Sequence, residues 1–86
     1  MKLTFLNRHG QVVNKTLKEV GTTWERMNNV RVDYVTKEEK EYLERYGLQT
    51  TIFNVANLRK YGYVQLPAHY VMVVLQHGAV DMRSKK

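Results

Sequence analysis

The sequence predicts a small single domain of the α+β class. Apolar and polar residues alternate on both sides of Asn7 and Gly10, which is typical of an antiparallel β-hairpin, here expected over residues 2–17. A helix-capping signal at Thr36 then introduces two segments of helical periodicity, separated by Gly47. With 86 residues, the chain is long enough for one domain with a thin core and too short for two.

The composition of residues 1–86 argues against several classes of site. There is no cysteine, which excludes a disulfide framework and a thiolate zinc site. His9, His69 and His77 are too far apart in the sequence to suggest a metal centre. Ser84 is the one serine, the glycines stand singly, and no acid lies at a spacing that sets it beside a base. We therefore expect neither catalysis nor a bound metal or cofactor.

A short helix and a strand are expected between the hairpin and the capping signal. Thr22 or Thr23 can act as the N-cap of the helix. Trp24 and Met27 follow three residues apart, so that both side chains can face the core. Residues 30–35 place valine and tyrosine at alternate positions, a pattern that predicts a strand.

The clearest local signal is the capping box of Thr36 and Glu39, which we take as the only complete one in the sequence. The helix that begins there has an apolar stripe around Leu43, while lysines and glutamates pair at i,i+4 spacing on its opposite, solvated face. Gly47 is expected to end the helix in a left-handed conformation, with Leu48 as its hydrophobic partner.

A second helix is expected from Thr50 or Thr51 to Tyr61, with Gly62 as its stop. Its apolar residues share one face. Arg59 falls on that same side and must extend its guanidinium from the last turn toward solvent.

Two structures compete for the C-terminal third. We favour a hairpin over 63–76 with Pro67 at the turn, because valine is frequent there. The alternative is a helix over 67–77 that starts at the proline and stops at Gly78. Residues 81–86 are expected to form a short basic tail.

Taken in their order along the chain, the expected elements over residues 22–77 resemble the winged helix-turn-helix architecture. The helix-turn-helix would occupy about 37–61 and the wing 63–76. The opening hairpin of 2–17 is an addition to that pattern, and the bulky Leu43 stands where such helix pairs often have a small residue. The resemblance implies that the second helix reads DNA.

Asn54 and Asn57 fall on the expected exposed face of that second helix, and other polar residues on or just before the helix also fit this role. Asparagine and glutamine can bond adenine in the major groove, threonine suits a base or a phosphate, and arginine and lysine neutralise the backbone. The same residues would also suit a solvated helix face, with the two basic residues complementing the negative end of the helix dipole. The predicted nucleic-acid-binding residues are Gln49, Thr50, Asn54, Asn57, Arg59 and Lys60.

The charge of the chain agrees with a polyanionic partner. The net charge is +6 and the isoelectric point is near 9.7, values that favour nucleic acid without requiring it. The longest apolar run, Tyr70–Leu75, is far too short for a membrane span. We expect a soluble, cytoplasmic, non-enzymatic regulator that binds double-stranded DNA.

The alternative is a small inhibitor or adaptor that docks on an acidic surface of a partner protein, of the kind that phages and mobile elements encode. Six tyrosines and one tryptophan among 86 residues supply the side chains that commonly anchor protein interfaces. The two functions differ in a measurable way, since a DNA binder should bind random duplex with a steep salt dependence.

Overall fold

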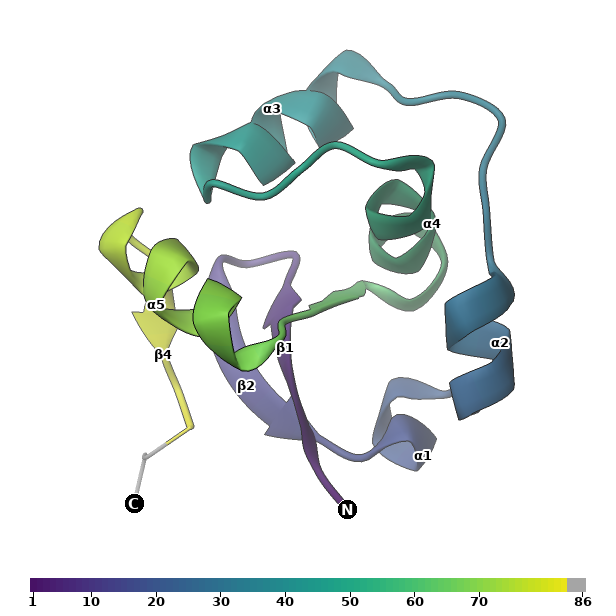
Figure 1. The fold of residues 1–86 in the computed structure, drawn as a ribbon, viewed down its shortest axis with the longest axis horizontal. Helices are drawn as coiled ribbons and strands as arrows, with labels where there is room; N and C mark the ends of the chain where they lie inside the picture. Colours follow the sequence, from purple (N-terminus) through teal and green to yellow (C-terminus); the bar gives the residue numbers. More distant parts are fainter. Residues whose placement is uncertain (84–86) are drawn as a thin grey trace.

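The structure is a computed structural model that describes residues 1–83, and these residues form a mixed four-stranded sheet and five helices. The elements in chain order are β1 (Leu3–Asn7), β2 (Gln11–Lys15), α1 (Leu17–Val20), α2 (Trp24–Asn29), α3 (Lys37–Arg45), α4 (Ile52–Tyr61), β3 (Tyr63–Gln65), α5 (Ala68–Gln76) and β4 (Val80–Asp81). In Figure 1, α3 lies across the top with α4 beneath it, and α2 and α5 flank the lower half on opposite sides. The α+β class predicted from the sequence is confirmed.

The opening hairpin is confirmed, with β1 and β2 paired antiparallel. The Asn7 side-chain oxygen holds the turn, since it accepts hydrogen bonds from the His9 and Gln11 amides at 2.9 and 3.1 Å. Gly10 has a φ of +72°, and a Cβ at this position would collide with the hydroxyl of Tyr46. Both the backbone conformation and the close approach of α3 therefore require glycine there.

The second strand ends earlier than the sequence analysis expects. A capping box at Thr16 stops it after Lys15, since the Thr16 hydroxyl accepts from the Glu19 amide at 3.1 Å and the Glu19 carboxylate accepts from the Thr16 amide at 2.7 Å. This box begins α1, a helix that the sequence analysis missed. The statement that Thr36 begins the only complete capping box is therefore wrong.

The sheet has the order β3-β1-β2-β4, with β3 antiparallel to β1 and β4 parallel to β2. The Met82 amide donates to the Val12 carbonyl at 2.9 Å and extends the contact beyond β4. The basic tail predicted over 81–86 is thus wrong at its start, because Asp81 belongs to a strand. Residues 84–86 of that prediction lie outside the described residues.

Two clusters of buried side chains lie on opposite faces of the sheet. The larger cluster joins Leu6 and Val12 to side chains from α3, α4 and α5. The smaller one joins Phe5 to Val20 and Met27, from α1 and α2. Because successive residues of a strand point to opposite faces, Phe5 and Leu6 each belong to a different cluster. The short hairpin therefore organises both cores.

The helix expected after Thr22 or Thr23 is α2, and Thr23 is its N-cap. The Thr23 hydroxyl accepts from the Arg26 amide at 3.2 Å. Met27 is fully buried, as expected, whereas Trp24 is 56% exposed. The prediction that both side chains face the core is therefore wrong for Trp24, which is the first residue of the helix and lies at the surface.

The strand predicted over 30–35 is wrong. This segment crosses from α2 to α3 without pairing to the sheet. Val32 is buried in the larger cluster, and Val30 and Val35 pack against it. The Arg31 guanidinium donates to the carbonyls of Val30 and Asn28, at 2.7 and 3.2 Å. The alternation of valines here reflects an extended loop that lies against helices.

The hairpin predicted over 63–76 is also wrong, and the helical alternative is correct. α5 starts directly after Pro67, whose φ is −59°, and Val71 and Val74 are its buried residues. Proline is well suited to a helix start because its missing N–H would have no partner there. The strand propensity of valine is outweighed by this start and by burial at three-residue spacing. Residues 63–76 therefore form a short strand and a helix and not the wing of a winged helix.

The helix pair that the sequence predicts is confirmed as α3 and α4. The capping box is formed, with the Glu39 amide donating to the Thr36 hydroxyl at 3.2 Å and the Thr36 amide to the Glu39 carboxylate at 2.9 Å. At the other end of α3, Gly47 has a φ of +74°, and the Leu48 amide donates to the Leu43 carbonyl at 2.9 Å. This pattern is a Schellman motif, and it buries Leu48.

Replacing Thr36 by alanine removes one partner of the capping box. We expect Thr36→Ala to lower the free energy of unfolding by about 1 kcal/mol, because the Glu39 amide loses its acceptor. Urea denaturation of both proteins measures this difference. Thr36→Ser, which keeps the hydroxyl, is the control and should stay near the parent. An unchanged midpoint for Thr36→Ala would show that the cap does not stabilise α3.

Candidate binding site

The second helix of the pair, α4, forms as predicted but is enclosed by the rest of the protein. Thr51 is its N-cap and accepts from the Asn54 amide at 3.0 Å. Its four central residues, Val55–Leu58, are all buried. Successive side chains of a helix are rotated by about 100°, so four consecutive buried residues mean that protein surrounds the helix on nearly every side. The middle of α4 therefore has no free face for the major groove of DNA.

The prediction that Asn57 lies on an exposed face is wrong. Its side chain is 0% exposed, and within residues 1–83 neither polar atom of its amide has a hydrogen-bond partner. A buried amide in this state typically costs about 1 to 3 kcal/mol. The Thr50 hydroxyl is likewise buried and without a partner in the described part of the chain. Neither group is accessible to a base in this structure.

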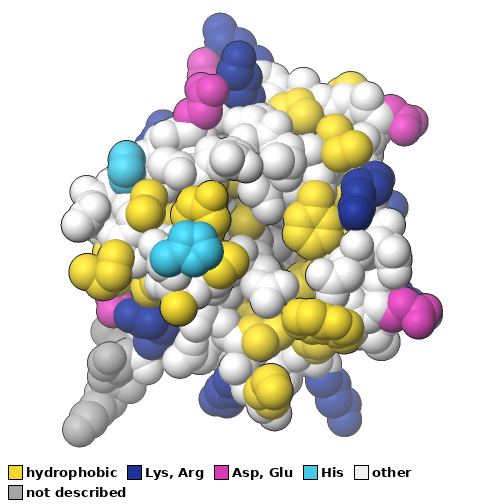
Figure 2. All heavy atoms as spheres, in the orientation of Figure 1, with side chains coloured by type: hydrophobic (Ala, Val, Ile, Leu, Met, Phe, Trp, Pro, Cys, Tyr) yellow, Lys and Arg dark blue, Asp and Glu magenta, His cyan; other side chains and the backbone are white. Residues whose placement is uncertain are grey.

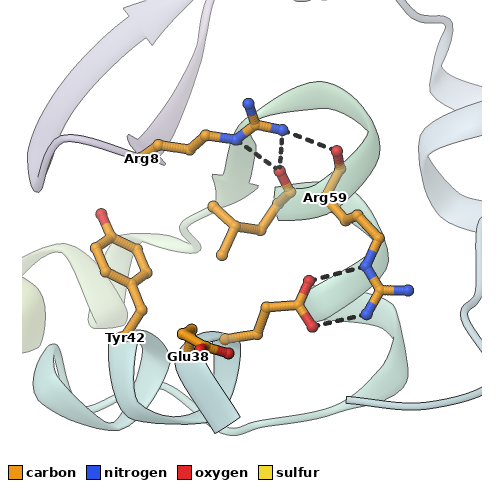
Figure 3. Close-up of a pocket in the computed structure, with 6 residues that line it drawn as sticks. Arg8, Glu38, Tyr42 and Arg59 are labelled. Atoms are coloured by element: carbon orange, nitrogen blue, oxygen red, sulfur yellow. Dashed lines mark hydrogen bonds and ion pairs between the residues drawn. The ribbon is translucent and has the colours of Figure 1, made fainter. Parts of the chain in front are cut away.

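Arg59 is committed to an ion pair within the fold. Its guanidinium donates to both oxygens of Glu39, at 2.6 and 2.8 Å, and lies 4.6 Å from the centre of the Tyr34 ring. The dashed lines at Arg59 in Figure 3 show this bidentate contact. Chiefly because of these hydrogen bonds, the pKa of Glu39 falls to about 2, although desolvation of the carboxylate opposes the shift. The pair fastens the start of α3 to the last turns of α4.

A second contact fastens the turn of the hairpin to the same helix. Arg8 donates to the carbonyl of Leu58 at 3.1 and 3.2 Å and to that of Arg59 at 2.8 Å, at the negative end of α4. The Tyr42 hydroxyl of α3 accepts from the Gly10 amide at 3.0 Å, and burial raises its pKa. A hollow of about 310 Å³ lies among these side chains (Figure 3). Since both guanidinium groups are already engaged, we interpret this region as a structural junction.

A larger surface lies on the face shown in Figure 2, where hydrophobic side chains gather over α2, α4 and α5 and acidic ones are seen only at the periphery. Its central part, which we call the β3 groove, has a volume of about 380 Å³. Aromatic and amide side chains line the groove together with Pro67. The aromatic residues are Trp24, Phe53 and Tyr70, and the amides are Asn28, Gln49, Asn54 and Gln65.

Two further hollows adjoin the β3 groove. One of about 500 Å³ shares Gln65 with it and is also lined by Lys2 and Arg83. The other, of about 400 Å³, shares Trp24 and has only apolar lining residues. No aspartate or glutamate of the described chain lines the groove or either of these hollows. Arg31 adds a positive charge beside the groove, 5.0 Å from the centre of the Phe53 ring.

The structure separates the residues predicted to bind nucleic acid. Gln49 and Asn54 both line the β3 groove, and the Asn54 side-chain amide donates to the Gln49 carbonyl at 2.8 Å. Lys60 is exposed but does not line the groove. Thr50, Asn57 and Arg59 are turned inward or paired, as described above. The predicted residues therefore do not form one surface.

The main residues of the groove were not found from the sequence. Trp24, Phe53, Gln65 and Tyr70 come from four separate elements or connections, and no spacing in the chain unites them. A usable signal existed at Trp24, because a tryptophan at the first position of a short helix has few neighbours to bury it.

Comparison with protein-family models, with curated proteins and with solved structures finds no match to this chain. Within residues 1–83, no helix combines the length and the apolar character that a membrane span needs. The same residues contain no group of three or more histidine, aspartate or glutamate side chains placed to hold a metal ion.

The Glu39–Arg59 pair predicts a specific acid sensitivity. Since the pKa of Glu39 is lowered from 4.5 to about 2 on folding, the stability it contributes is present above pH 4.5 and is lost as the pH falls toward 2. For a pair that stays partly in solvent, we expect this contribution to be about 1 kcal/mol. Urea denaturation across this pH range measures it.

Glu39→Gln should be less stable than the parent at neutral pH, and the difference should shrink on acidification. Glu38→Gln is the matched control, because the neighbouring carboxylate takes no part in the pair. If the difference in free energy of unfolding between the parent and Glu39→Gln is the same at every pH, the ion pair contributes nothing.

Proposed function

We propose that the protein is a non-enzymatic binding module that docks on an acidic surface of a partner protein. The observation that carries the proposal is the β3 groove with two adjoining hollows that share lining residues with it, none of which is lined by an acidic residue of the described chain. Tryptophan, tyrosine and arginine are the residue types that most often anchor protein interfaces. An acidic partner would meet Lys2, Arg31 and Arg83 around this surface, which gives electrostatic complementarity.

Exposed apolar side chains support the same location. Of the six large hydrophobic residues that are well exposed, Met1, Trp24 and Met72 line the groove or the hollows. Exposed apolar side chains at such hollows support an interaction site, because apolar surface is costly to leave in water. Burial of these side chains against a partner would favour association by about 25 cal/mol for each Å² of apolar surface removed from water.

The DNA-binding regulator predicted from the sequence is the second candidate. Its support is the net charge of +6 and the presence of Gln49 and Asn54 in an accessible groove. It would require contacts other than those of a recognition helix, since the middle of α4 is enclosed. We therefore rank it below protein binding.

Selection from a library of random peptides displayed on phage tests the proposal. We expect the selected peptides to carry net negative charge together with aromatic or aliphatic residues, because the groove offers apolar hollows and basic surroundings. Trp24→Ala should weaken binding of these peptides about tenfold or more, as for a buried anchor residue. Isothermal titration with synthetic copies of the selected peptides measures the affinities.

Ile52→Ala is the matched control, since Ile52 is exposed but lies outside the groove and both hollows. It should bind as the parent does. A parallel titration uses random duplex DNA between about 50 and about 200 mM salt. Peptides without a charge preference, or binding that Trp24→Ala leaves intact, would contradict the proposal. Tight duplex binding with a steep salt dependence would favour the DNA-binding regulator instead.

A further inference from the structure

We propose that the partner contributes an extended acidic segment that binds as an additional β-strand along the free edge of β3. This inference rests on the proposed function and specifies its mode of binding. Such strand addition uses main-chain hydrogen bonds for affinity and alternate side chains for specificity. Three features of the structure support it: the orientation of the amides and carbonyls of β3, the position of the groove and the distribution of charge.

The register of β3 with β1 determines which amides and carbonyls of β3 point away from the sheet. Leu6 lies opposite Val64, and the Leu66 amide donates to the Thr4 carbonyl at 2.9 Å. In an antiparallel ladder, residues whose amides and carbonyls face the neighbouring strand alternate with residues whose groups face away. Since Val64 and Leu66 face β1, the amide and carbonyl of Gln65 point outward, away from the sheet.

The outward edge lies at the groove. Val64 and Gln65 line the groove, with Trp24 of α2, Phe53 of α4 and Tyr70 of α5 as its aromatic walls. Figure 1 shows β3 between these three helices and in front of β1. At the other end of the strand, the Tyr63 side chain packs against the smaller core and does not line the groove. Gln65 is therefore the residue whose outward main-chain groups lie at the groove.

The other edge of the sheet is poorly suited to an acidic strand. β4 is only Val80–Asp81, and the Asp81 carboxylate accepts from the Arg83 guanidinium at 3.0 and 3.1 Å. A charged side chain on a short edge strand is a common device against strand addition. β3 has no charged residue, since it consists of tyrosine, valine and glutamine. The two edges thus differ in charge as well as in surroundings.

The chemistry of the groove identifies the occupant. Side chains of an added strand alternate between its two faces, so that one set can enter the aromatic groove while the other stays near its rim. Apolar residues suit the first set because Trp24, Phe53 and Tyr70 form the walls. Carboxylates suit the second set because Lys2 lines the adjoining hollow and Arg31 lies over the ring of Phe53. The segment is therefore an extended protein segment that alternates acidic and apolar residues.

A short acetylated peptide that alternates glutamate with valine and phenylalanine is the probe. We expect its addition to slow hydrogen exchange of the Gln65 amide in the full chain, because that amide gains a main-chain partner. Gln65→Pro removes this outward N–H but not a bond to β1, and proline is tolerated on edge strands in that orientation. It should weaken peptide binding about tenfold, the value of one such bond, whereas Gln65→Ala keeps this N–H and should weaken binding less than Gln65→Pro does.

A variant of the peptide tests the same bond without changing the protein. Alternate nitrogens of the peptide form two sets, one that faces β3 and one that faces away. Methylation of the set that faces β3 blocks main-chain pairing and should abolish binding, whereas methylation of the other set should leave binding intact. A lysine-for-glutamate peptide should fail to bind. The inference is overturned if every methylated peptide binds as the parent peptide does, if Gln65→Pro folds and binds normally, or if the acidic peptide does not bind at all.

These outcomes separate the inference from the proposed function. If peptides selected on phage depend on Trp24 but leave exchange of the Gln65 amide unchanged, docking at the groove holds and strand addition is wrong. If single-stranded DNA slows exchange at Gln65 and the acidic peptide does not, both the inference and the proposal of an acidic protein partner are wrong.

Discussion

The carboxylate of Glu39 is the contact on which the arrangement of the helices depends. One of its oxygens accepts from the Thr36 amide at 2.9 Å and from the Arg59 guanidinium at 2.6 Å, while the other accepts from Arg59 at 2.8 Å. A single side chain thus starts α3 and holds it against α4. Arg8 holds the last turn of the same helix to the hairpin. With the end of α4 held by both contacts and its middle buried, the accessible surface lies at its start, where Phe53 and Asn54 line the β3 groove.

Local signals in the sequence predicted the parts of the fold that local chemistry determines. The turn at Asn7 and Gly10, the capping box at Thr36 and the stop at Gly47 all combine a specific residue type with a specific backbone geometry. These signals were sufficient to predict the hairpin and the α3–α4 pair. The missed helix α1 carries a signal of the same kind at Thr16, so it was predictable as well.

The remaining errors have tertiary causes. Alternating valines predicted a strand at 30–35 and frequent valines predicted a hairpin over 63–76, but in both places burial against helices determines the structure. Polar character predicted an exposed Asn57, whereas the residue is enclosed by neighbours that are distant in sequence. The β3 groove was unpredictable for the same reason, because its walls come from α2, α4 and α5 and meet only when the chain folds.

We propose that the partner binds in the β3 groove and not on the outer face of α3 or at the end of α4. An experimental structure of the complex with the tightest acidic peptide selected on the protein decides between these locations. We expect the peptide to lie in the β3 groove, between Trp24 and Tyr70, with its carboxylates toward Lys2 or Arg31. A peptide seated on the outer face of α3, or beside Lys60, would show that the groove is not the binding site.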